Sequence, residues 1–208
     1  MNSLYYLPWI PALLIMLSTM IAVYSLSKPK IFTLAKYLYY AAAGIVALML
    51  ICLLMAFVTC KFQYSYVYHY SSVDLPVLYR IAGVWAGQEG SIALWTFFIM
   101  IAGIIAVNRE EQLKQSFLTI LGLVSLIFMI HCINNNPFAY IWDTSKNFPV
   151  NIIPTDGAGL NPLLQDFWMI IHPPVLFIGY ALFTIAFIYA ILSLLYNNYS
   201  IILTAYRY

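Results

Sequence analysis

The residues best suited to chemistry lie late in this chain, where a histidine directly precedes two prolines. His172 is followed by Pro173 and Pro174 and stands at the mouth of a long apolar stretch. A neutral imidazole is a good metal ligand, and two prolines would hold the backbone that presents it. An ionisable side chain beside so apolar a segment is a functional hypothesis by default. The pattern therefore makes His172 a candidate functional residue.

A second group of candidate residues lies where Trp85 and Trp95 flank the sequence Gly-Gln-Glu-Gly-Ser. The plain interpretation is a well-capped helix, because Ser91 suits a helix cap and Glu89 is favoured near a helix amino end. The two tryptophans go beyond what capping requires, and the glycines would let a large flat molecule approach the backbone closely. We therefore regard this segment, including Gln88, as a weaker candidate site.

The other histidines and the cysteines carry weaker signals. His69 lies in the tyrosine-rich segment 64–70, whose period of two is typical of a short extended segment in an interfacial aromatic belt. We expect His69 to be a solvated loop residue and His131 an interface residue. The three cysteines form no Cys-x-x-Cys pair, so they indicate neither a redox nor a zinc motif. A disulfide between Cys60 and Cys132 is geometrically allowed but has no support in the sequence.

Composition indicates which elements must position these residues. The chain has 208 residues, of which 64% are hydrophobic and 8% charged, whereas soluble proteins carry about 25% charged residues. Five stretches are apolar enough to cross a bilayer as helices, each of which needs roughly 20 residues. They cover residues 5–26, 36–59, 90–107, 116–133 and 173–195. We therefore expect an all-α integral membrane protein of about five transmembrane helices, in which residues 1–208 form a single transmembrane domain.

The basic residues predict the orientation of these helices. Six lie on one side of the expected spans and three on the other, in much longer loops. By the positive-inside bias, the side with six faces the cytoplasm or matrix and the amino terminus lies outside. The six are Lys28, Lys30, Lys36, Arg109, Lys114 and Arg207, and the three are Lys61, Arg80 and Lys146. The small net charge of +2 argues against a nucleic-acid partner.

Both candidate sites fall in two long outer loops, where function is commonly placed. These loops are residues 60–89 and 134–172. In the second loop, Asn161 is a good helix cap and Pro162 a good first helical residue, so we expect a short interfacial helix at 162–171. Residues before proline avoid the α region, so His172 would form a junction, with its imidazole in the space above the bundle. The alternative is one kinked, continuous helix in which the histidine binds a freed backbone carbonyl, and residue physics favours neither.

Together these loops resemble the CcmF/NrfE-type haem lyases of cytochrome c maturation, within the wider CcmF/CcsA family of haem-handling membrane proteins. The resemblance covers most of residues 62–180, and the first two spans match only in hydrophobicity. Three blocks carry it, and the last is the most specific. They are Leu-Pro-Val-Leu-Tyr-Arg at 75–80; Trp-Ala-Gly-Gln-Glu-Gly-Ser at 85–91 with Leu-Trp at 94–95; and Gly-Leu-Asn-Pro-Leu-Leu-Gln-Asp at 159–166 with His-Pro-Pro at 172–174 and Gly-Tyr at 179–180.

The resemblance implies haem handling and delivery, with attachment of haem vinyl groups to the two thiols of a Cys-x-x-Cys-His apocytochrome c at the outer face. It implies that His172 is an axial ligand to the iron of a transiently bound haem, with Trp85, Gln88, Glu89 and Asp166 as a supporting shell. The implied partners are apocytochrome c, a haem chaperone, thiol-reducing maturation subunits and the lipid bilayer. The implied location is the bacterial inner membrane, with the active face in the periplasm, or an organellar inner membrane.

The 208 residues lack three features of the family that they resemble. They contain no tryptophan-rich WWD segment, no second outer histidine beside it and no intramembrane histidines for a resident b-type haem. We therefore expect an amino-terminal portion of a cytochrome c assembly domain, from a truncated gene, a split subunit or a fragment, and a second chain could carry the missing segment. Haem lyase activity would need that part. The alternative is a non-catalytic structural or assembly subunit of a membrane complex. A small transporter is disfavoured, because the spans carry almost no polar residues beyond Ser and Thr.

Overall fold

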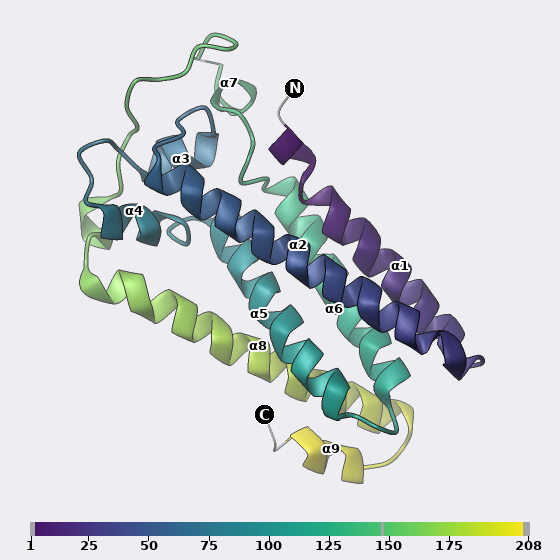
Figure 1. Ribbon diagram of the computed structural model, residues 1–208. Coiled ribbons are helices and arrows are strands. Elements are labelled where there is room, and N and C mark those ends of the chain that lie inside the picture. Colours follow the sequence, from purple (N-terminus) through teal and green to yellow (C-terminus); the bar gives the residue numbers. More distant parts are fainter. Residues whose placement is uncertain (1–2, 147, 206–208) are drawn as a thin grey trace.

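Helices make up the regular structure of the described chain, residues 3–146 and 148–205, in the computed structural model (Figure 1). Within these residues the β-type pairing is an isolated bridge between Tyr64 and Tyr140. The α-helices are α1 (Trp9–Ser25), α2 (Phe32–Val58), α3 (Ser65–Tyr70), α4 (Val77–Gly83), α5 (Gln88–Arg109), α6 (Lys114–Asn134), α7 (Ile141–Thr144), α8 (Phe167–Leu195) and α9 (Ser200–Ala205). The 3-10 helices are η1 (Ser3–Tyr6), η2 (Pro29–Ile31) and η3 (Pro162–Leu164).

Five helices are long and apolar enough to cross a membrane, which confirms the expected all-α, multi-pass membrane fold. The candidate spans are Leu4–Ser25, Pro29–Val58, Gln88–Arg109, Lys114–Asn134 and Phe167–Leu195. The second span begins several residues before the predicted position. The last begins at Phe167, well before residue 173, and this shift changes the setting of the histidine that follows.

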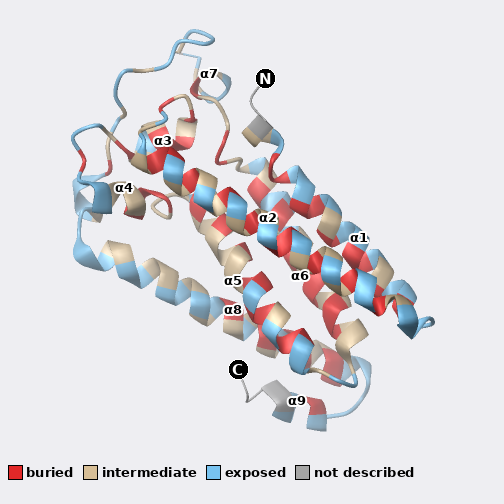
Figure 2. Cartoon of the chain, in the orientation of Figure 1, coloured by how far each residue is buried: buried red, intermediate tan, exposed pale blue. Residues whose placement is uncertain are grey.

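The long helices pack as a bundle in which α1 contacts α2 and α6, while α5 contacts α6 and α8 (Figure 1). Apolar surface alone does not drive helix association in lipid, so small residues matter at the contacts. A side chain on Gly122 would overlap Thr19, which places α6 directly against α1. In the core, the buried hydroxyls of Tyr39 and Ser125 hydrogen-bond at 2.7 Å. The outward faces carry exposed apolar side chains, as lipid contact requires (Figure 2).

The two long loops gather at one end of the bundle, together with the amino terminus (Figure 1). Backbone hydrogen bonds join segment 63–65 to 139–141, and segment 68–71 to 158–159. The two loops therefore form one layer over the helix ends. Which side of the membrane this layer faces stays a prediction, and Arg207, one of the residues used to orient the chain, lies outside the described residues.

Arg80, from the first motif block, has a structural role in this layer. Its guanidinium donates hydrogen bonds to the backbone carbonyls of Leu75 at 2.7 Å, Val58 at 3.2 Å and Val73. Five N–H donors in a rigid fork suit one side chain to several carbonyls. Arg80 thereby ties the turn before α4 to the end of α2.

Two local predictions for the loops were wrong. Residues 64–70 are not an extended segment, because α3 covers Ser65–Tyr70 and the bridge to the other loop is made by Tyr64. Burial of Tyr66 and Val67 decides the conformation of so short a segment. Ser91 is not the cap of the third span, because α5 begins at Gln88.

The predicted interfacial helix at 162–171 was also wrong. The range contains η3 (Pro162–Leu164) and, after a break, the first turn of α8, and Asn161 caps η3 by accepting a hydrogen bond from the backbone N–H of Leu163 at 3.0 Å. The capping signal was therefore read correctly, but the helix stops after one turn. Asp166 then starts a new helix, because its carboxylate accepts from the backbone N–H of Trp168 at 2.8 Å.

Candidate functional site

His172 lies inside α8 and not at a junction between two helices. The helix begins at Phe167 and continues through Pro173 and Pro174 to Leu195 without interruption. The alternative of one continuous helix is therefore correct, and the predicted junction at His172 is wrong.

The indole of Trp85 supports the continuous helix at Pro173. Pro173 has no N–H, so it cannot donate to the carbonyl four residues earlier, that of Met169. Trp85 donates its Nε1–H to this carbonyl at 2.9 Å. The tryptophan thus replaces the hydrogen bond that the proline removes, and it joins the turn before α5 to the first turns of α8. The sequence analysis had considered a freed carbonyl bound by the histidine, whereas the donor is a residue 84 positions away.

The His172 side chain is exposed and points away from the helix bundle. It shares a face of α8 with Trp168 and Leu176, which lie one turn before and after it and are 68% and 39% exposed. The buried residue Ala181 lies nine positions on, about 180° around the helix. The imidazole therefore faces outward from the side of α8, not into the space above the bundle as predicted. Among the described residues, no hydrogen bond joins it to Trp85, Gln88, Glu89 or Asp166.

The turn between α4 and α5 is built around the buried hydroxyl of Tyr66. This oxygen accepts from the backbone N–H of Gly87 at 3.0 Å and donates to the Val84 carbonyl at 3.0 Å. Burial raises the pKa of Tyr66, and hydrogen bonds from the Gly87 region oppose that rise. A side chain on Gly90 would overlap the Val84 carbonyl oxygen, so only glycine fits there. Tyr66 was not singled out from the sequence, because nothing in it marks one tyrosine of the segment as internal.

This turn presents Gln88 and Glu89 in different directions. Gln88 lies beside α6, where its Nε2 is 2.9 Å from Nε2 of His131. Glu89 lines a depression of about 490 Å³ with His69, Tyr70 and the segment 158–162. Burial raises the pKa of Tyr70, and the negative charge of Glu89 raises it further. The structure thus brings Glu89 to the third motif block but places Gln88 in another site.

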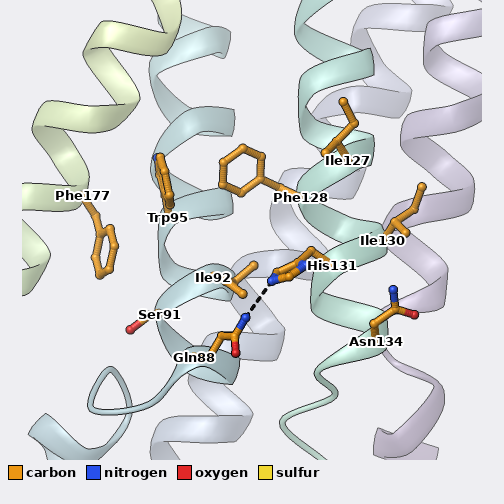
Figure 3. Close-up of a pocket in the computed structure, with 10 residues that line it drawn as sticks. All are labelled: Gln88, Ser91, Ile92, Trp95, Ile127, Phe128, Ile130, His131, Asn134 and Phe177. Atoms are coloured by element: carbon orange, nitrogen blue, oxygen red, sulfur yellow. Dashed lines mark hydrogen bonds between the residues drawn. The ribbon is translucent and has the colours of Figure 1, made fainter.

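The Gln88 site is a cavity of about 580 Å³ between α5, α6 and α8 (Figure 3). This volume is in the range of small-molecule pockets, roughly 300–1,000 Å³. Polar groups lie at one end, where Gln88, His131 and Asn134 are found, and the rings of Trp95 and Phe177 lie further along (Figure 3). The remaining lining residues are Ser91, Ile92, Ile127, Phe128 and Ile130.

His131 was expected only to be an interface residue, and it is exposed near the end of α6. The sequence missed its pairing with Gln88, because the two are separated by 43 positions. The available signal was that two polar residues, Gln88 and His131, both fall at the predicted outer ends of apolar spans. The roles of Trp85, Gln88, Glu89 and Asp166 as a haem shell stay a prediction. In the structure, Trp85 donates a hydrogen bond to the Met169 carbonyl and Gln88 pairs with His131. Glu89 lines a surface depression, and Asp166 caps α8.

The described residues contain no cluster of three or more His, Cys, Asp or Glu that could hold a metal ion. Cys52, Cys60 and Cys132 are free thiols.

Comparison with known proteins gives consistent matches. The sequence model of the family described as "Cytochrome C assembly protein" matches residues 85–204. The cytochrome c-type biogenesis protein CcmF of Haemophilus influenzae is 31% identical over 194 residues, which cover 88% of this chain and 29% of that protein. CcmF of Escherichia coli is 38% identical over 148 residues, which cover 69% of this chain and 22% of that protein.

A solved structure titled "Cytochrome c Heme Lyase CcmF" has a TM-score of 0.71 over 93% of this chain and 30% of that chain, at 16% identity. It supports the fold. The chain spans less than a third of the length of these proteins. Similarity to the Haemophilus protein reaches at least into the second span, so the view that the first two spans match only in hydrophobicity was too narrow. Because the family match covers more than half of the chain and the fold agrees, the chain belongs to the cytochrome c assembly protein family.

Proposed function

We propose that this chain handles haem during cytochrome c maturation and presents it to apocytochrome c, with haem as the molecule delivered. The observation that carries the proposal is the exposed imidazole of His172 on a rigid helix start. The motif blocks around it support the same assignment, as do relatives named as cytochrome c-type biogenesis proteins. A bacterial inner membrane with the loop layer in the periplasm is the location that fits these relatives and the distribution of basic residues.

His172 would serve as one axial ligand of the haem iron, through a ring nitrogen of its neutral imidazole. Its surroundings suit that role. Trp168 and Leu176 extend the same exposed face and offer apolar surface to a macrocycle. The bond from Trp85 to Met169 and the Asp166 cap hold the first turns of α8, so the imidazole starts from a fixed backbone. The second axial position would come from another segment or another chain, because the outward face of α8 has no second imidazole beside it.

The chemistry of attachment belongs to the haem vinyl groups and the cytochrome thiols, and the protein contributes position and iron ligation. The chain would act with apocytochrome c, a haem chaperone and thiol-reducing subunits, together with the part of the relatives that lies beyond its matched length. Residues 1–208 would form one transmembrane domain of that assembly.

The test is the haem content of protein purified from membranes that also contain the maturation partners. His172→Ala should lower the ratio of haem to protein, measured from the Soret absorbance, without changing membrane insertion. His69→Ala is the matched control, because His69 lies at the same end of the bundle and lines a depression to which His172 does not contribute. An unchanged haem content in His172→Ala would reject the ligand role and favour a structural or assembly subunit.

A further inference from the structure

The end of the bundle opposite the loop layer carries most of the basic side chains of the described chain (Figure 1). Positive charge at one end of the spans is the ordinary positive-inside pattern and does not by itself make a binding site. A site needs several cations at one place, without acids to neutralise them. The basic residues at this end are Lys28, Lys30, Lys36, Arg109 and Lys114, and the acids are Glu110 and Glu111.

Two of these lysines converge on the start of α2. Lys36 belongs to α2, and its Nζ lies 5.8 Å from the ring centroids of both Tyr37 and Tyr40. Lys114 begins α6, and its Nζ lies 5.8 Å from the ring centroid of Phe32. Phe32 and Lys36 are four positions apart, so they share one face of α2. Two ammonium groups from different helices therefore lie over the first two turns of α2.

The end of α5 is held at the same place. The Tyr40 hydroxyl donates a hydrogen bond to Oδ1 of Asn108 at 2.6 Å, and Nδ2 of Asn108 donates to the Ile104 carbonyl at 2.9 Å. These bonds hold the last turn of α5 beside α2. Arg109, the next residue and the last of α5, is exposed and adds a third positive charge to this corner of the bundle.

The charges of the two lysines are not neutralised within the described chain. Both carboxylate oxygens of Glu110 have other partners: one caps the turn before α6, and the other accepts from the Tyr189 hydroxyl at 3.2 Å. Glu111 is exposed, and among the described residues no ion pair joins a carboxylate to Lys36 or Lys114. An aromatic ring attracts an ammonium group but has no net charge, so the rings position the lysines and leave their charge available.

Apolar surface continues from this charged corner toward the middle of the spans. Ile105 and Ile101 lie one and two turns before Arg109 on α5 and are 46% and 37% exposed. Leu48 on α2, three turns after Lys36, is 50% exposed. Tyrosines such as Tyr37, which is exposed, are typical of the level of the lipid headgroups. A ligand that is anionic at one end and apolar along the rest of its length matches this surface.

We propose that this corner binds an anionic phospholipid, with Lys36 and Lys114 contacting its phosphate, Arg109 beside it, and the acyl chains lying along α2 and α5. Lysine binds phosphate as a point charge, so the site recognises charge more than shape. The apolar surface favours a lipid over a free phosphate ion. Because one headgroup would bridge α2 and α6, the bound lipid should stabilise the bundle. The proposal does not depend on haem handling.

The experiment is native mass spectrometry of the purified protein with phosphatidylglycerol or phosphatidylcholine of the same acyl chains. The unaltered protein should retain phosphatidylglycerol in preference. Replacing both lysines, Lys36→Gln with Lys114→Gln, should lower this retention about tenfold or more, since each lysine near an anionic surface contributes roughly fivefold. Lys61→Gln with Lys146→Gln is the matched control, because it removes the same charge at the loop layer and should leave retention unchanged. Gel filtration checks that both variants are folded.

Three results would overturn the proposal. Equal retention of the two lipids by the unaltered protein would do so without any variant. An equal loss in Lys28→Gln with Lys30→Gln would show a diffuse charge effect and no site at Lys36 and Lys114. The third arm is the thermal unfolding midpoint: if inorganic phosphate raises it as much as phosphatidylglycerol does, the corner binds a free anion and not a lipid.

Discussion

The start of α8 and the end of α6 each present one exposed histidine, but in opposite surroundings. His172 lies on the exposed face of α8, and the indole of Trp85 donates a hydrogen bond to a backbone carbonyl of the same helix. His131 stands at the rim of a concave, aromatic cavity and is held directly by Gln88. The first site needs another segment to complete it, whereas the second has its own walls. A strong motif therefore marked the histidine with fewer neighbours, whereas no motif marked His131, which has more.

One turn, residues 85–91, serves both regions. From this turn, the Trp85 side chain hydrogen-bonds to α8 and the Gln88 side chain to α6. The buried hydroxyl of Tyr66 accepts a hydrogen bond from the backbone of the turn at Gly87. Variants of this turn should disturb both histidine sites together, whereas variants at its two ends should disturb one. That difference orders the following predictions from the largest effect to the smallest.

Gly90→Ala should have the largest effect, because its methyl group would overlap the Val84 carbonyl oxygen. Overpacking of this kind typically costs about 1–3 kcal/mol, and more where backbone must move. We expect a clear fall in the thermal unfolding midpoint of the detergent-solubilised protein and a lower haem content. Gly44→Ala is the control: nothing lies within 4 Å of a Cβ there, so it should be neutral or slightly stabilising. Equal effects of the two variants would show that the turn is not the tight contact described.

Tyr66→Phe should come next, since it leaves the Gly87 N–H and the Val84 carbonyl without their partner. Loss of buried hydrogen-bond partners costs about 1–3 kcal/mol. The variant should also change the response to alkali. Because burial raises the pKa of Tyr66 in the folded protein, the unfolded chain loses this proton first, at about pH 10, and stability falls as the pH rises further. Thermal unfolding between neutral pH and pH 11 should show a shallower alkaline loss in Tyr66→Phe, and an identical slope would refute the role of this hydroxyl.

Trp85→Phe should affect only the α8 side. It removes the donor to the Met169 carbonyl and should cost about 1–2 kcal/mol. Pro173→Ala restores a backbone N–H that can reach the same carbonyl, so in a Pro173→Ala background the loss of Trp85 should cost less. A double-mutant cycle on thermal stability measures this coupling. Additive effects would mean that the indole does not replace the missing helix bond.

Asp166→Ala should have the smallest effect, about 1 kcal/mol, because it removes one amino-terminal cap. Asp166→Ser should restore stability, as serine also caps. If Asp166→Ser is stable but binds less haem at His172, the carboxylate has a role beyond capping and the shell prediction is sharpened.

Sequence patterns were most reliable where one property dominates. Hydrophobicity over about 20 residues predicted five spans, because in lipid the backbone must form its own hydrogen bonds. The cap at Asn161 was also recognised correctly, and Glu89 does lie in the first turn of its helix, but the predicted cap at Ser91 was wrong. The junction at His172 failed, because proline is unfavourable in a helix unless something distant supplies the missing bond. The extended segment at 64–70 failed because burial of Tyr66 outweighs a weak local pattern.

The sequence by itself determined the class of fold, the family and the histidine that its motif exposes, because these depend on composition and on short runs of residues. Only the tertiary structure decided that Trp85 completes the helix across Pro173, that Gln88 meets His131, and that an aromatic cavity opens beside them. Each of these facts joins residues more than 40 positions apart. Such contacts follow from how five helices pack in three dimensions, and no local pattern in the chain records that packing.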